Sequence, residues 1–96
     1  MFVVTLTYLT DLARVDEALP DHLAWLDRQY ADGVFLASGR RVPRTGGVIL
    51  AGGVDRAELD RRLATDPFAT RGVAGYEVTE FVASRVADGL DRMREG

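Results

Sequence analysis

Hydrophobic and polar residues alternate at the start of the chain, which is the pattern of a β-strand. The alternation runs over residues 2–9 and sorts the side chains into two sets: Phe2, Val4, Leu6 and Tyr8 on one face, and Val3, Thr5, Thr7 and Leu9 on the other. We therefore expect a strand with one apolar face and one mixed face.

From Leu12 the apolar period changes to three or four residues, which indicates a helix. The apolar stripe is formed by Leu12, Val15, Leu19, Leu23, Leu26 and Tyr30. Pro20 lies inside this stripe, and proline is tolerated in the first turn of a helix but disrupts its interior. We predict that the main helix begins near Pro20, or kinks there, and that Gly33 ends it.

Three further strands are indicated by short apolar segments. They are residues 34–39 (VFLASG), 47–54 (GVILAGGV) and 76–83 (YEVTEFVA), and a basic loop over 40–45 joins the first two. Residues 84–95 are expected to form a C-terminal helix, with Val86, Leu90 and Met93 along one side.

Two aspartates mark the starts of helices between the third and fourth strands. Asp55 is the expected N-cap of one helix, and Glu58 follows at the spacing of a capping-box partner. Asp66 is the expected N-cap of a short second helix, because Pro67 suits the first helical position and Gly72 suits the stop.

The resulting order of strand, helix, strand, strand, helix, strand predicts an α+β fold of the ferredoxin-like βαββαβ type with an antiparallel sheet. The 96 residues should form one domain, with its core in residues 2–83 and the extra helix in 84–95. In such a fold the helices cover one sheet face. Neither face of the first strand is polar enough for water, so we expect a second copy to cover the open face in a homodimer.

Composition narrows the classes of function. The chain has no cysteine and one histidine, which excludes disulfides, thiol nucleophiles and multi-histidine metal sites. The net charge of −3 and the lack of a basic stripe argue against nucleic-acid binding. No apolar run has transmembrane length and the first residues do not resemble a signal peptide, so we expect a cytoplasmic protein without membrane association. No cofactor is expected.

The single histidine, His22, is the first candidate for chemistry. It lies at the border of the apolar helical stripe, where a cleft between helix and sheet can open. It can be a general acid/base, or a boundary residue bonded to the backbone. Asp66 can be a helix cap, a carboxylate that orients an imidazole, or both, because a carboxylate has two oxygens.

Ser38 and Gly39 end the second strand and are candidates for contact with a substrate. Ser38 completes, with His22 and Asp66, the residue types of a hydrolase triad. The strained GxSxG turn of such hydrolases is absent, so a polar contact with a ligand is the favoured interpretation.

Three arginines, Arg40, Arg41 and Arg44, share the basic loop. They can bind an anionic group of a substrate, or form a solvated surface loop. We include Arg40, which directly follows Ser38 and Gly39, among the candidate substrate-binding residues.

The segments HLAWLDRQYADGVFLASGR, ATDPF and YEVTEF, with a hairpin between the first two, resemble the YciI-like (YCII-related) family. Its motifs are the His-Leu pair at His22, the Ser-Gly pair at Ser38, and the Asp-Pro-Phe sequence at Asp66. The resemblance extends from Phe2 to about Val82, so the C-terminal helix lies outside it.

The resemblance implies a ferredoxin-like fold, a dimeric α/β-barrel-like assembly joined through the sheets, and a pocket whose catalytic residues match His22 and Asp66. Ser38 and Gly39 match the edge of that pocket, and Phe68 of the Asp-Pro-Phe motif is a further candidate for substrate contact. The chain departs from the family at Arg40, where proline is common.

Two hypotheses of function follow. The first is a small cofactor-independent enzyme that abstracts a proton from, or carries out an elimination on, a small organic molecule, with His22 as general acid/base and Asp66 orienting it; hydrolysis through Ser38 is a variant. The second is a non-catalytic dimeric module that binds a small ligand or a protein. Kinship with dimeric α/β-barrel monooxygenases and isomerases is a third, by fold analogy. An enzyme should bring His22 and Asp66 within hydrogen-bond reach in a pocket.

Overall fold

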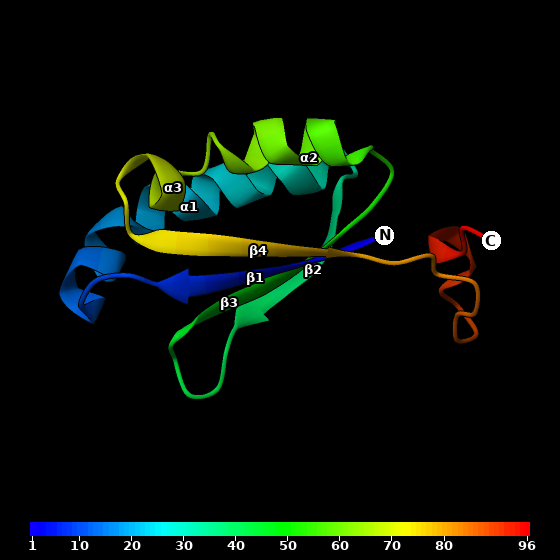
Figure 1. Cartoon of the computed structure of the whole chain (residues 1–96), viewed down its shortest axis with the longest axis horizontal. Coiled ribbons are helices and arrows are strands. Elements are labelled where there is room, and N and C mark those ends of the chain that lie inside the picture. The colour runs from blue at the N-terminus through cyan, green and yellow to red at the C-terminus, as the bar shows by residue number, and fades with distance from the viewer.

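A four-stranded antiparallel sheet carries all of the α-helices on one of its faces (Figure 1). This computed structural model describes residues 1–96. Its elements are β1 (Phe2–Tyr8), α1 (Leu12–Ala31), β2 (Phe35–Arg40), β3 (Gly46–Ala51), α2 (Arg56–Leu63), α3 (Pro67–Thr70) and β4 (Ala74–Glu80). The strand order β2-β3-β1-β4 is that of a ferredoxin-like fold, so the predicted α+β class is confirmed.

The central strand β1 lies between β3 and β4 and sets which side chains face the helices. Phe2, Val4 and Leu6 are buried on the helix-covered face, where Val4 pairs in register with Ile49 of β3. Val3 and Thr5 point to the opposite, open face. The two-residue alternation in the sequence therefore identified the inner face of the sheet correctly.

Helix α1 begins earlier than predicted. Asp11 is its N-cap, and the Asp11 side chain accepts a hydrogen bond of 3.0 Å from the backbone N–H of Arg14. The helix then continues through Pro20 to Ala31. The prediction that it begins near Pro20 was wrong, and the missed signal is the aspartate directly before Leu12.

Packing explains why α1 tolerates an internal proline. Pro20 itself is exposed, while Val15 and Trp25, on either side of it in sequence, are fully buried. Burial of both halves of the helix outweighs the hydrogen bond that proline removes, a loss of about 3 kcal/mol. The helix ends before Gly33, which has a positive φ of 75° as expected for a residue that stops a helix. No helix in the structure has both the length and the apolar character that are needed to cross a membrane.

The cap of α2 is only half of the predicted capping box. The Asp55 side chain accepts a hydrogen bond of 2.8 Å from the backbone N–H of Glu58, as expected. The Glu58 carboxylate does not return to Asp55; it accepts hydrogen bonds from Arg61 and Arg62. The predicted return contact from Glu58 to Asp55 was therefore wrong, because two arginines one turn further along the helix bind the Glu58 carboxylate. The hydrogen bond from Arg61 is the main reason that the pKa of Glu58 is lowered.

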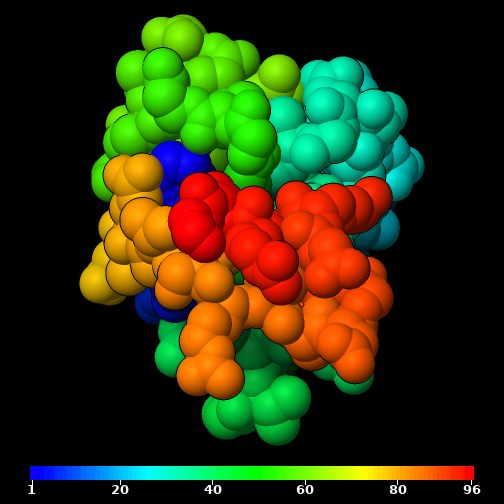
Figure 2. Space-filling model, turned by 90° about the vertical axis from the view of Figure 1, so that its right-hand side faces the viewer, coloured from blue at the N-terminus to red at the C-terminus, as the bar shows by residue number.

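The predicted helix over residues 84–95 was also wrong. The segment contains only a single 3-10 turn, η1 (Asp91–Met93). Gly89, which precedes this turn, has a positive φ of 89° that does not fit a helix. Leu90 stays exposed, so the apolar side of the predicted helix finds no surface to pack against. The segment instead lies across the end of the sheet beside the N-terminus (Figure 2). The Glu95 carboxylate binds the Met1 amino group there at 2.7 Å.

Candidate active site

The structure brings His22 and Asp66 together although 44 residues separate them. His22 lies on the sheet-facing side of α1, and Asp66 is the N-cap of α3. Nδ1 of His22 is 2.7 Å from Oδ1 of Asp66. His22 is 8% exposed and Asp66 is 0% exposed. The pair is therefore almost completely removed from bulk water, which strengthens the interaction between its members.

The Asp66 carboxylate binds three groups at once. Besides His22, Oδ1 accepts a hydrogen bond of 2.9 Å from the backbone N–H of Phe68, and Oδ2 accepts one of 2.6 Å from the Tyr76 hydroxyl. Asp66 is thus both the predicted cap and the partner of the imidazole. Burial, and then the adjacent Asp66 carboxylate, raise the pKa of Tyr76, so its hydroxyl stays protonated and donates.

Aromatic rings hold the imidazole in place. The Phe68 ring stacks on His22 with centroids 3.9 Å apart and planes only 2° from parallel. Trp25, one turn along α1, stacks on His22 at 5.7 Å, and its indole N–H donates a 2.9 Å hydrogen bond to Thr65. The structure places Phe68 in the core against the imidazole and not in the cavity wall, which differs from its predicted role as a substrate contact.

His22 opens into a cavity of about 240 Å³ between α1 and strands β1, β2 and β3. Apolar side chains of α1 form one wall. The opposite wall includes the predicted site residues Ser38, Gly39 and Arg40. Gly46 and Gly47 also line it, and at Gly46 a Cβ atom would lie 1.8 Å from the Leu6 carbonyl oxygen. Only glycine therefore lets β3 approach β1 here.

The predicted residues around the cavity have different surroundings. The Ser38 hydroxyl is 2.6 Å from the Tyr30 hydroxyl, and no hydrogen bond joins Ser38 to His22. The geometry of a serine hydrolase triad is therefore absent. Arg40 also lines an adjoining hollow of about 430 Å³, whose other arginine, Arg44, forms an ion pair with Asp16.

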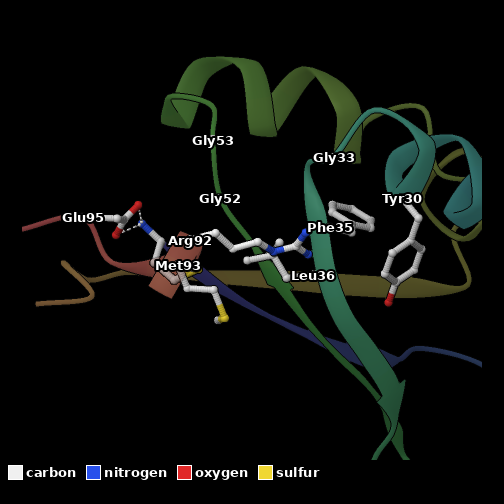
Figure 3. Close-up of a pocket in the computed structure, with 10 residues that line it drawn as sticks. Tyr30, Gly33, Phe35, Leu36, Gly52, Gly53, Arg92, Met93 and Glu95 are labelled. Carbon is white, nitrogen blue, oxygen red and sulfur yellow. Dashed lines mark hydrogen bonds and ion pairs between the residues drawn. The ribbon is translucent and has the colours of Figure 1, made fainter. Parts of the chain in front are cut away.

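A third hollow, of about 460 Å³, lies at the other end of β2 (Figure 3). Its wall combines Tyr30 and Phe35 with the C-terminal segment, from which Arg92 reaches toward β2 (Figure 3). Glu95, its only carboxylate, is already bound to the Met1 amino group. This hollow contains no buried pair of ionisable side chains, so the His22 cavity is the candidate active site.

The sequence analysis did not identify Tyr76 as part of the site. It is opposite Leu6 in the register of β1 and β4, so it faces the helices. A tyrosine at an inward position needs a partner for its hydroxyl, and that requirement was the available signal. No group of three or more histidine, aspartate or glutamate side chains is placed to hold a metal ion.

Fold and site together define a ferredoxin-like α+β domain with a buried histidine–aspartate pair at the edge of a small cavity. The chain belongs to the family of the YCII-related domain, whose model matches residues 1–82. The matched range includes His22, Ser38 and Asp66 and excludes the C-terminal segment, so the resemblance predicted from the sequence is confirmed.

A comparison with curated proteins found no match in sequence. Among solved structures, the fold is similar to that of 5-chloro-2-hydroxyhydroquinone dehydrochlorinase (TftG) from Burkholderia phenoliruptrix AC1100, in complex with 2,5-dihydroxybenzoquinone. The TM-score is 0.72 and the identity is 18%, over 83% of this chain and 91% of that chain. At this identity the similarity establishes a shared fold.

Proposed function

We propose that this protein is a small-molecule enzyme in which His22 transfers a proton and Asp66 orients and supports it. The observation that carries the proposal is the 2.7 Å contact between the almost buried His22, which lines a cavity, and the fully buried Asp66. A carboxylate in this position holds one tautomer of the imidazole and stabilises the imidazolium that forms when the ring takes up a proton. A positioned base of this kind contributes roughly 10²–10⁴-fold to a rate.

The contacts assign separate tasks to the two ring nitrogens. Nδ1 is bound to Asp66, so Nε2 is the nitrogen that meets a substrate in the cavity. The carboxylate already receives hydrogen bonds from Phe68 and Tyr76, which keep it fixed as an acceptor. His22 therefore returns to the same orientation after each proton transfer, because the stacked Phe68 ring also prevents it from turning.

The reaction class that we propose is elimination from a small hydroxylated ring. The ring first passes to its keto tautomer, in which one hydroxyl proton has moved to the ring carbon that bears the leaving group. Nε2 then takes the proton of a second ring hydroxyl, and the electron pair of that O–H bond forms a C=O bond. The adjacent ring double bond shifts toward the carbon that bears the leaving group, which departs with the electrons of its own bond to carbon. The products are a quinone-type compound and the protonated leaving group, so no oxidant is required. A cavity of about 240 Å³ suits a single ring, and the similar fold of a dehydrochlorinase supports this class.

The test is an anaerobic assay of chloride release from 5-chloro-2-hydroxyhydroquinone and related chlorinated hydroxyphenols, with the protein and with buffer alone. We expect at least one member of this panel to release chloride faster with the protein. Binding of 2,5-dihydroxybenzoquinone without chloride release from any member would favour the alternative, a non-catalytic ligand-binding module.

The open sheet face leads us to propose a homodimer. Val3 of β1 pairs with Leu50 of β3 on this face, and Val48, also on this face, is 39% exposed. Apolar side chains that share one face without a cover are typical of an interface, and in a small homo-oligomer the simplest cover is a second copy.

Sedimentation at micromolar concentration should give a species of about twice the chain mass of 10.5 kDa. Leu50→Glu, on the open face, should give a folded monomer. Val42→Glu, in the exposed loop between β2 and β3, is the matched control and should leave the dimer intact. A wild-type protein that sediments only as a 10.5 kDa species would contradict the dimer.

A further inference from the structure

Arg40 lies at the end of β2, the edge strand of the sheet, and lines both the His22 cavity and the adjoining hollow. It forms no ion pair and no side-chain hydrogen bond, whereas Arg44 nearby is bound to Asp16. The Asp16–Arg44 pair has no net charge. Arg40 therefore contributes an uncompensated positive charge to the wall of the cavity that holds His22.

The surroundings of Arg40 leave room for a ligand. Its partner in the register of β2 and β3 is Gly47, which has no side chain to fill the space. Ser38, two residues before Arg40 on the same side of the strand, and Tyr8 add hydroxyl groups to the wall. Each hydroxyl has a proton that can be donated to an anion, and the guanidinium adds charge and a planar pair of donors.

A cation in the cavity wall also favours the binding of an anion on electrostatic grounds. Asp66 contributes a buried negative charge behind His22, and that charge opposes the entry of an anion. The positive charge of the Arg40 guanidinium in the cavity wall opposes this repulsion. The two charges thus favour a ligand that places its anionic group at Arg40 and its reacting group toward His22.

We propose that Arg40 determines specificity by binding the negatively charged oxygen of an anionic ligand of this site, which is the carboxylate of a substrate or the ionised hydroxyl of a quinone-type product. The assignment rests on the proposed function for the reaction at His22, but binding at Arg40 is tested separately. The required ligand is a small planar oxyanion, and an uncharged ring of the same size should bind without help from Arg40.

Two probes of one ring size separate charge from shape: 2,5-dihydroxybenzoquinone, whose acidic hydroxyls are ionised at neutral pH, and uncharged hydroquinone. Dissociation constants are measured by calorimetry for the wild type, Arg40→Gln and Arg41→Gln. Arg41 is the matched control, because it is also exposed and unpaired but lines none of these hollows. Arg40→Gln should weaken binding of the dihydroxyquinone roughly ten- to hundredfold and leave hydroquinone unchanged. Arg41→Gln should change neither by more than about twofold.

Added salt should weaken the binding of the dihydroxyquinone to the wild type more than to Arg40→Gln. Equal losses of affinity for the dihydroxyquinone in Arg40→Gln and Arg41→Gln would overturn the inference, because only net charge would then matter. The inference would also be overturned if Arg40→Gln lost no affinity, or if the wild type did not bind the dihydroxyquinone. Binding that depends on Arg40 without any chloride release would overturn the proposed function and leave this inference standing. If the protein releases chloride, and Arg40→Gln alters neither the release nor the binding of the dihydroxyquinone, the inference about Arg40 is overturned and the proposed function stands.

Discussion

Replacing Asp66 with alanine is expected to lower the free energy of unfolding by about 3–5 kcal/mol, the usual cost of removing one partner from a buried charged network. The Asp66 carboxylate is fully buried and is the acceptor for His22, Tyr76 and the backbone N–H of Phe68. Alanine leaves these polar groups without a partner and without water. Urea unfolding followed by circular dichroism measures the loss.

Asp55→Ala is the matched control for this prediction. Asp55 also caps a helix, but it is exposed and accepts a hydrogen bond only from Glu58. Its loss should cost about 1 kcal/mol and leave ligand binding unchanged. If the two alanine variants lose the same free energy, Asp66 is no more than a helix cap, and the network described here does not stabilise the fold.

The second large effect concerns catalysis. In the chloride-release assay, His22→Gln should reduce the rate roughly 10²–10⁴-fold, because glutamine retains a donor for Asp66 but cannot take up a proton at Nε2. Asp66→Asn should also slow the reaction while it preserves the fold. The asparagine carbonyl can accept from His22 and from the Phe68 N–H, and the Tyr76 hydroxyl can turn to accept from the amide.

Both variants must be shown to be folded before their rates are compared, and Asp55→Ala is the control variant with an intact site. A His22→Gln protein that releases chloride as fast as the wild type would place the proton transfer on another group. Equal rates for wild type and Asp66→Asn would remove Asp66 from the mechanism and leave it a structural residue only.

Local signals in the sequence predicted most of the fold. The alternation at Phe2 and Val4 identified the inner face of β1, and Asp55 and Asp66 marked the starts of α2 and α3. Such signals depend on only a few neighbouring residues. The start of α1 was placed wrongly because tertiary packing on both sides of Pro20 decides whether the helix continues.

The predicted helix in the C-terminal segment was wrong for a related reason. The spacing of Val86, Leu90 and Met93 suits a helix, but periodicity alone does not provide a surface to bury the apolar side. For the candidate site, the residue types and the family resemblance predicted His22 and Asp66 as catalytic residues. Their contact depends on how α1 and α3 pack, which no local pattern specifies.

The most direct test of the central claim is the protonation of the two nitrogens of His22 in its neutral form. The chain has one histidine, so a two-dimensional ¹H–¹⁵N spectrum of the imidazole contains one pair of nitrogen signals. Because Asp66 binds Nδ1, the neutral ring should carry its proton on Nδ1 and leave Nε2 unprotonated toward the cavity. The preference for the proton on Nδ1 should weaken in Asp66→Asn, and also in Asp66→Ala if that variant is folded. A neutral ring protonated on Nε2 in the wild type would contradict the account, because His22 could not then accept a proton from a substrate.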